Sequence, residues 1–170
     1  MCSGKLDHFE IVWNRLKNHN PHAVTLLVPL IDGVDDVDIL TKKIKLSNAE
    51  RQLAKFITTH RKSVEHEFPL KPYQDILVSV PRKTSEELRI QVIELMYYHG
   101  KEELVKEMSD WKVSQFPVNG NDLKQFNIKP GPDFGKILNR LREIWKESYF
   151  VLSQEELLAK VENLLQSQKP

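Results

Sequence analysis

Two aspartates one residue apart, Asp36 and Asp38, are the first candidates for chemistry in this sequence. An Asp-x-Asp pair can hold two metal ions, which stabilise both the attacking and the leaving oxygen of a transfer reaction. On a strand the two side chains point to one side, whereas on a helix they point about 200° apart. Here the pair precedes a lysine-rich run (Lys42, Lys43 and Lys45) that suits the C-terminal end of a helix. We therefore interpret the aspartates as an acidic first turn, and a small metal enzyme built on them and the histidines is the weakest alternative.

The histidines do not complete such a site. His19 and His22 have the i, i+3 spacing of metal ligands, but no Cys, Asp or Glu lies close to them in the sequence. His60 and His66 flank a polar stretch, and no His-Asp doublet occurs. The sequence contains no Gly-x-Ser-x-Gly nucleophile motif and no phosphate loop. We therefore predict no catalytic residue, no metal site and no cofactor in this chain.

Basic residues near two glycines are better candidates, and they point to binding. Backbone N–H groups at a helix start attract an anion, because the helix dipole and the unpaired donors both favour negative charge. Gly120 and Gly131 each precede a predicted helix. The candidate phosphate contacts are these two glycines and the cations near them: Gly120, Lys124, Lys129, Gly131, Lys136 and Arg140. The simpler alternative is that the cations lie on ordinary solvated helix faces.

The stretch 116–141 must position these residues, and it predicts two short helices joined by a tight turn. Asn119 and Gly120 suit the N-cap of the first helix. The segment 129–132, Lys-Pro-Gly-Pro, ends one helix and starts the next, because Pro is tolerated at the first helical position. We expect Gly135 to allow another backbone to approach closely. One apolar stripe marks the second helix: Phe134, Ile137, Leu138, Leu141, Ile144 and Trp145.

This stretch resembles the tail domain of CCA-adding tRNA nucleotidyltransferases. That family carries a Pro-hydrophobic-x-Gly-x-Asp-Leu element, then Gly-x-x-hydrophobic-Gly-x-x-Leu. The matching residues are Pro117, Val118, Gly120, Asp122, Leu123, Gly131, Phe134, Gly135 and Leu138. Asn127 stands where the family commonly has glycine, and Asn tolerates the left-handed backbone that such a turn needs. Segments 23–27 and 69–75 also look like mitochondrial-type animal members, so the resemblance covers nearly the whole chain.

The resemblance implies the C-terminal body and tail portion of such an enzyme, without its catalytic head domain. The expected fold is an elongated all-α array of about eight to ten helices, with a body at 1–112 and a tail at 113–170. The whole enzyme adds C, C and A to tRNA 3′ ends from CTP and ATP, with magnesium in the head. This chain alone should then be inactive. Its tail would bind the tRNA elbow, and its body would act as a spacer along the acceptor arm.

Composition neither supports nor opposes an RNA partner. The chain has 170 residues, 40% of them apolar and 29% charged, and its net charge is only +1. No apolar run approaches the ~20 residues that cross a bilayer, so we expect no membrane partner. The single Cys2 fits a reducing, intracellular compartment, whether mitochondrial, cytoplasmic or nuclear. The main alternative is a helical module that binds a protein, or forms a homodimer, through an exposed apolar face.

The rest of the sequence is also helical by its periodicity, and no region alternates with period two. We expect the first helix to bury Leu6, Phe9, Trp13 and Leu16, and Asn20 to cap the second. Capping boxes begin at Ser47 and Ser153. The predicted helices are 6–16, 22–31, 34–46, 48–60, 72–80, 85–99, 102–111 and 154–165. Segment 72–80 could be helix or strand on local evidence, and its helical neighbours favour helix. The sequence therefore predicts an all-α fold.

Overall fold

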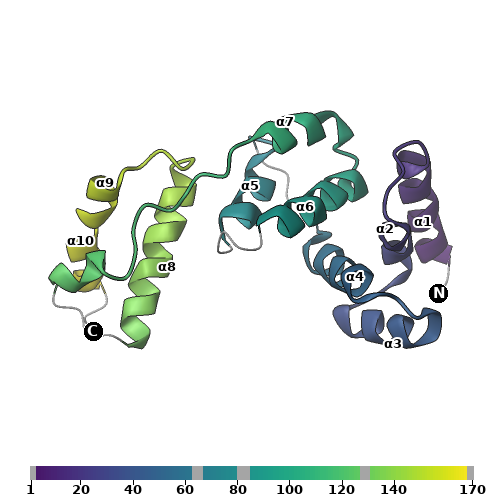
Figure 1. Ribbon diagram of the computed structural model, residues 1–170, viewed down its shortest axis with the longest axis horizontal. Coiled ribbons are helices and arrows are strands. Elements are labelled where there is room, and N and C mark those ends of the chain that lie inside the picture. Colours follow the sequence, from purple (N-terminus) through teal and green to yellow (C-terminus); the bar gives the residue numbers. More distant parts are fainter. Residues whose placement is uncertain (1–2, 63–66, 80–84, 127–130, 168–170) are drawn as a thin grey trace. The chain divides into compact units, whose positions relative to one another are not determined.

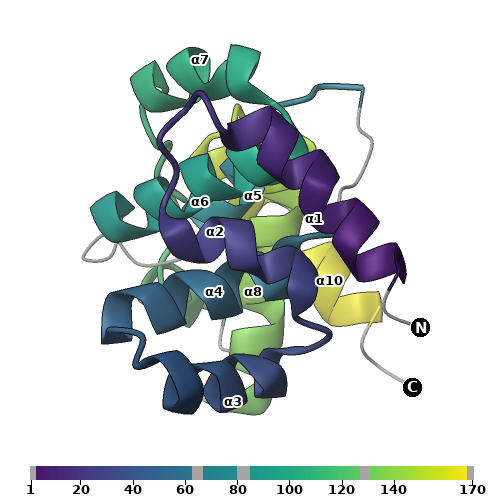
Figure 2. The ribbon, with the colours of Figure 1, turned by 90° about the vertical axis from the view of Figure 1, so that its right-hand side faces the viewer.

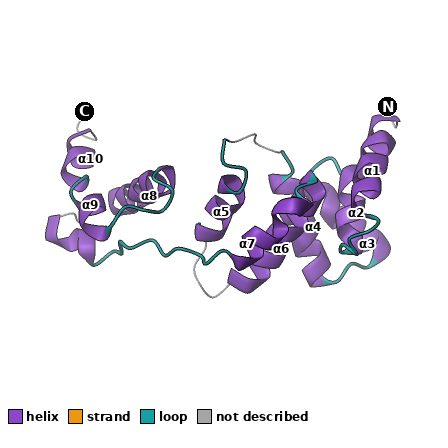
Figure 3. Ribbon diagram, turned by 90° about the horizontal axis from the view of Figure 1, so that it is seen from above, coloured by secondary structure: helices purple, strands orange, loops and turns teal. Residues whose placement is uncertain are grey.

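The computed structural model describes residues 3–62, 67–79, 85–126 and 131–167, and structural statements below concern only these. They form helices and no strand (Figures 1 and 3), which confirms the all-α prediction. The chain divides into two compact units, Met1–Lys112 and Val113–Pro170. No helix in the described part of the chain is both long and apolar enough to cross a membrane.

Unit 1 is a packed set of helices, part of which faces the viewer in Figure 2. Its elements are α1 (Ser3–Leu16), α2 (Ala23–Leu27), the 3-10 helix η1 (Val28–Leu30), α3 (Val34–Ile44), α4 (Asn48–His60), α5 (Lys71–Val78), α6 (Ser85–His99), the 3-10 helix η3 (Glu102–Leu104) and α7 (Val105–Asp110). The segment after Pro69, which could be helix or strand on local evidence, is the helix α5, as predicted.

Helix α6 is the centre of unit 1, because α1, α2, α4, α5 and α7 all pack against it. Leu88, Val92, Leu95 and Met96 of α6 are buried, whereas Ile90 is 53% exposed. Tyr98 is buried as well, at 3% exposure, while its neighbour Tyr97 is not. A helix that is covered on most sides needs apolar residues around most of its circumference, and α6 has them.

Local signals set several helix ends as predicted. Ser47 and Glu50 form a reciprocal capping box at the start of α4. Gly100 ends α6 with φ 70°, the left-handed conformation that glycine adopts without steric cost. The Gly100 N–H donates to the Tyr97 carbonyl and the Lys101 N–H to the Met96 carbonyl, which is the Schellman pattern of a helix C-terminus.

Long-range polar contacts fasten other helix ends of unit 1. The buried Glu94 carboxylate accepts from the His22 backbone N–H at 3.2 Å and from the Thr25 hydroxyl, and so caps α2. Arg89 donates to the carbonyls of Met108, Ser109 and Trp111 at the end of α7. These contacts join residues far apart in sequence, so no local pattern could reveal them.

His99 links three elements at the end of α6. Its Nε2 lies 3.1 Å from the Arg61 carbonyl, which can only accept, so Nε2 carries the proton. Its Nδ1 then accepts from the Tyr73 hydroxyl at 2.8 Å. Burial, with a smaller contribution from Glu103, raises the pKa of Tyr73 to about 12, so the phenol remains a donor. Burial also lowers the pKa of His99.

Unit 2 is built on α8 (Pro132–Glu147), which buries Ile137, Leu141 and Trp145. The other elements are the 3-10 helix η4 (Asp122–Phe126), α9 (Gln154–Leu158) and α10 (Val161–Ser167). Leu123, Leu157 and Val161 have no exposed surface and contribute to the core. The predicted capping box at Ser153 and Glu156 is present at the start of α9.

Helix α8 also ends in a Schellman pattern, but without glycine. The Tyr149 N–H donates to the Lys146 carbonyl and the Phe150 N–H to the Trp145 carbonyl. Tyr149 and Phe150 have φ values of 58° and 65°, where side chains are strained. The expected hydrophobic contact of this motif is present, because the rings of Trp145 and Phe150 lie 5.1 Å apart. No sequence signal marks this end.

Two predictions about the first helices are wrong. Of the residues predicted to be buried in α1, Leu16 is buried, together with Val12, but Leu6 and Trp13 are 55% and 45% exposed. Asn20 does not cap α2; its φ is 49° and the N-cap is His22. The first error arises because α1 has apolar residues on two faces, and only tertiary contact decides which is buried. The second arises because Glu94, from α6, does the capping.

Candidate nucleic-acid interface

The N-terminus of α8 is open in the way that an anion site requires. Gly131 is the N-cap residue, it is exposed, and no side chain caps the helix there. Pro132 occupies the first position, as predicted, and has no N–H to offer. The Gly135 N–H reaches only the Gly131 carbonyl, at a long 3.4 Å. No cap therefore neutralises the positive end of this 16-residue helix, and the Asp133 carboxylate in the first turn is its nearest negative charge on the helix.

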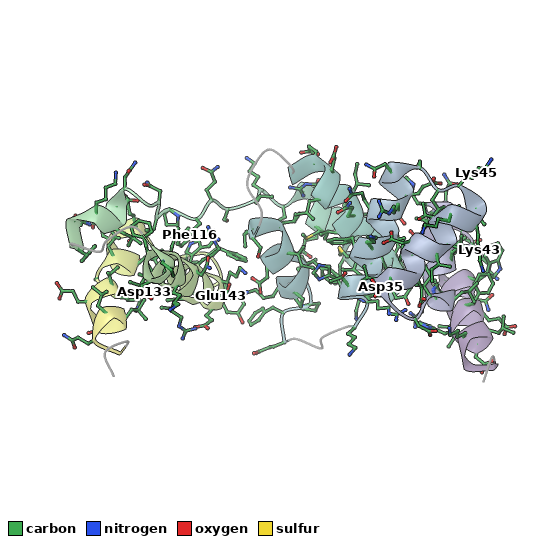
Figure 4. All side chains as sticks on the ribbon, turned by 90° about the horizontal axis from the view of Figure 1, so that it is seen from below. Asp35, Lys43, Lys45, Phe116, Asp133 and Glu143 are labelled. Carbon is green, nitrogen blue, oxygen red and sulfur yellow. The ribbon has the colours of Figure 1, made fainter. Side chains whose placement is uncertain are left out.

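The cations Lys136 and Arg140 follow on the exposed surface of α8, one turn apart. Lys136 Nζ lies 2.9 Å from Asp133, with the two side chains 66% and 73% exposed. Arg140 Nη1 lies 3.5 Å from Glu147, with exposures of 54% and 65%. Asp133 and Glu143 are labelled along α8 in Figure 4. Exposed ion pairs of this kind contribute at most about 1 kcal/mol, so an incoming phosphate can compete for both cations.

The other predicted helix start, near Gly120, is less open. The Asn119 N–H donates to the Asp122 carboxylate at 2.7 Å, and the Asn121 N–H donates to the Asn119 side chain at 2.8 Å. The Asp122 N–H bonds the Asn119 carbonyl. These amides are already used, and the Asp122 carboxylate adds negative charge. Lys124, on η4, is exposed.

Gly120, and not Gly135, is the glycine that allows close packing in unit 2. A Cβ on Gly120 would lie 3.2 Å from the ring of Phe134, so this glycine permits close contact between the turn and α8. Among the residues that the structure describes, none has an atom within 4 Å of a Cβ placed on Gly135, so the predicted close approach of another backbone is wrong there. It lies on the exposed side of α8. Lys129 lies outside the described residues.

The Asp-x-Asp pair lies on the helix α3, as its interpretation required. Asp36 accepts from the Gly33 backbone N–H at 3.1 Å, which caps α3. Asp38 accepts from Arg51 at 2.7 Å and from Lys55 at 2.9 Å, and these bonds lower its pKa to about 2. The described residues contain no group of three or more His, Cys, Asp or Glu that could hold a metal ion.

Histidine and tyrosine rings have structural partners. The rings of His19 and Tyr97 stack at 5.5 Å, and the backbone N–H of His22 donates to Glu94.

Trp145 of α8 is buried between Phe116 and Phe150. Arg142 lies over the Phe116 ring at 5.1 Å, a cation–π contact. Figure 4 labels Phe116 beside α8.

Known proteins match nearly all of this chain. CCA tRNA nucleotidyltransferase 1, mitochondrial, is 35% identical to it in Mus musculus and 34% identical in Homo sapiens, in each case over 162 residues. The Danio rerio protein of the same name is 31% identical over 163 residues. Each match covers 93% of this chain. This chain is related to part of the CCA tRNA nucleotidyltransferases. The resemblance that its tail motif indicates is thereby confirmed.

The chain spans 37% of the length of these CCA tRNA nucleotidyltransferases, which agrees with a match to a C-terminal portion. No family model matches the sequence. The matched length includes both units, so the likeness to CCA tRNA nucleotidyltransferases is not confined to the tail motif in unit 2.

Proposed function

We propose that this chain is the tRNA-docking portion of a CCA-adding tRNA nucleotidyltransferase. The observation that carries the proposal is the match over 93% of the chain to enzymes whose names specify tRNA. Within unit 2, the proposed site is the uncapped start of α8 at Gly131 with Lys136 and Arg140 further along the helix. Lys124 and Lys129, which precede α8 in the sequence, are further candidate contacts. The Gly120 turn supports this site by packing on α8.

We propose that unit 2 recognises tRNA by the shape of its backbone and the spacing of its phosphates. The site offers backbone amides and the exposed cations Lys136 and Arg140, and groups of this kind make most of their contacts with the sugar-phosphate backbone. Proteins recognise A-form RNA mainly in this way, because its deep major groove excludes side chains. Unit 2 would bind the elbow of tRNA, which leaves the 3′ end free for addition.

A salt titration tests docking directly. A tRNA transcript titrated with this chain should bind weakly, with an affinity that falls steeply between 50 and 200 mM salt, because each phosphate contact releases counterions. Equal affinity at both ends of this range, or no binding at low salt, would exclude docking through phosphates. The salt range is about that over which phosphate-binding proteins lose most of their affinity.

A charge-reversal pair locates the contact. Lys136→Glu with Arg140→Glu should weaken binding and make the slope of log affinity against log salt shallower by about 1.4, at about 0.7 per contact. The control is Lys17→Glu with Lys106→Glu, which makes the same charge change at exposed positions of unit 1. If both pairs weaken binding equally, the effect is one of net charge and the contact is not at α8.

Nucleotide addition itself is proposed for residues other than those of this chain. With tRNA, CTP, ATP and magnesium, the chain alone should extend no tRNA, and any labelled product would contradict this. The names of the relatives suggest mitochondria for the parent protein. Cell fractionation of the tagged chain distinguishes that compartment from the cytoplasm and the nucleus.

A second candidate function, self-association or protein binding, is favoured by one observation. Leu6, Ile11 and Trp13 of α1 are 55%, 50% and 45% exposed, and further exposed apolar residues follow in α3. Leu6 and Trp13 are seven positions apart on α1 and therefore share one exposed apolar face, the kind of surface through which proteins associate. Light scattering over a concentration series tests it: a mass that stays monomeric from micromolar to millimolar concentration excludes the homodimer.

A further inference from the structure

Helix α3 ends in the densest group of cations in the chain. Lys42, Lys43 and Lys45 occupy three of four consecutive positions, which happens nowhere else in the sequence. All three side chains are exposed. From residue 39 to residue 49 the sequence has no acidic residue. Figure 4 labels Lys43 and Lys45 at this end of α3, away from Asp35 in its first turn.

The nearest carboxylates in sequence are occupied by other groups. Asp38 accepts from Arg51 and Lys55 of α4. Glu50 accepts from the backbone N–H and the hydroxyl of Ser47. Among the described residues, no ion pair involves any of the three lysines, whereas Lys136 and Arg140 of unit 2 are both paired. The cluster therefore presents three uncompensated charges to solvent.

Helix stability does not explain a cluster of this density. One cation near a helix C-terminus contributes about 0.3–1 kcal/mol through the dipole, but three like charges within one turn repel each other. Lys45 also has φ 53°, the left-handed conformation, at a position where glycine or asparagine is usual. Glycine, which has no Cβ, would adopt this conformation without strain, and backbone strain of this kind concentrates at ligand-binding positions.

We propose that Lys42, Lys43 and Lys45 form a second RNA-backbone contact, in unit 1, for phosphates of the same tRNA. This inference rests on the proposed function and changes the role expected for unit 1 from a passive spacer to a binding surface. Exposed lysines are point charges with flexible stems, which suits contact with several phosphates without base readout.

The test compares two triple variants of the full chain. Lys42→Gln, Lys43→Gln and Lys45→Gln should make the salt slope of tRNA binding shallower by about 2, at about 0.7 for each contact. The matched control is Lys17→Gln, Lys106→Gln and Lys112→Gln, which removes the same charge from exposed positions and should leave the slope nearly unchanged. The α3 variant should melt at the wild-type temperature or above, because a repulsion is removed.

The outcomes separate this inference from the proposed function. If the wild-type chain binds tRNA and the α3 variant binds with the same affinity and slope, the second contact is refuted while docking through α8 stands. If the wild-type chain binds no tRNA, both fail. If the α3 variant keeps tRNA binding but loses binding to a poly-glutamate peptide, the cluster serves an acidic protein and the RNA contact is refuted.

Discussion

Glu94 should be the most sensitive polar residue of unit 1. It is 6% exposed, comes from the central helix α6, and caps α2 through the His22 N–H and the Thr25 hydroxyl. Glu94→Ala removes the acceptor from the buried Thr25 hydroxyl and from the part-buried His22 N–H. At about 1–3 kcal/mol for each unsatisfied group, and with some relief from no longer burying a charge, we expect a loss of about 3 kcal/mol.

Glu94→Gln separates the hydrogen bonds from the charge. The Gln oxygen can still accept from the His22 N–H, and the Thr25 hydroxyl can rotate to accept from the Gln amide. Every group then keeps a partner, so this variant should lose only about 1 kcal/mol, the charge-assisted part of the bonds. Thr25→Val should fall between the two variants, because it removes one partner of the carboxylate.

Amide hydrogen exchange read by mass spectrometry can test this ordering. Faster exchange should be confined to peptides of unit 1, beginning with α2, while unit 2 provides an internal control in the same sample. Equal losses for Glu94→Ala and Glu94→Gln would refute the reasoning, because the charge and not the pairing of donors would then control stability. Equal acceleration in both units would refute the local assignment.

Three further predictions concern single residues. Gly100→Ala should cost about 1–2 kcal/mol in urea unfolding, because φ is 70° there, and adding Arg15→Ala should not restore it although Arg15 is the nearest side chain. Burial lowers the pKa of His99 below its usual value of 6.5. The contribution of neutral His99 to the free energy of unfolding is therefore present above about pH 6.5 and is lost as pH falls. Unit 1 should therefore weaken from pH 7 to 5, less steeply in His99→Gln. Ser153→Ala should cost about 1 kcal/mol, visible as faster exchange in unit 2 alone.

Local chemistry made most helix ends predictable. The capping boxes at Ser47 and Ser153, the stop at Gly100 and the start at Pro132 each depend on residues within one turn. The end of α8 could not be predicted, because Tyr149 adopts a conformation that the sequence gives no reason to expect. The buried face of α1 and the cap of α2 required knowledge of α6, which is distant in sequence.

The position of the candidate site could be predicted from the sequence, but which of its cations and amides are already paired could not. Gly131 is the exposed N-cap of α8, Lys136 follows in its second turn and Arg140 lies one turn further along, yet only coordinates reveal the ion pairs that the two cations make. The amides near Gly120 are used by Asn119 and Asp122, a pairing that the same residues would allow but not require. Which of these residues contacts RNA stays a prediction.

The contacts of Arg89 help to set the length of the extended segment that follows α7. Its guanidinium holds the last carbonyls of α7, and residues 111–119 beyond them form neither helix nor strand. If Arg89→Ala let the six residues of α7 unravel, each would gain about 1.8 Å of length, or about 11 Å in all. The length of a tether sets the effective concentration of one binding module beside another, so cooperation between the two proposed phosphate-binding surfaces would change although neither surface had been altered.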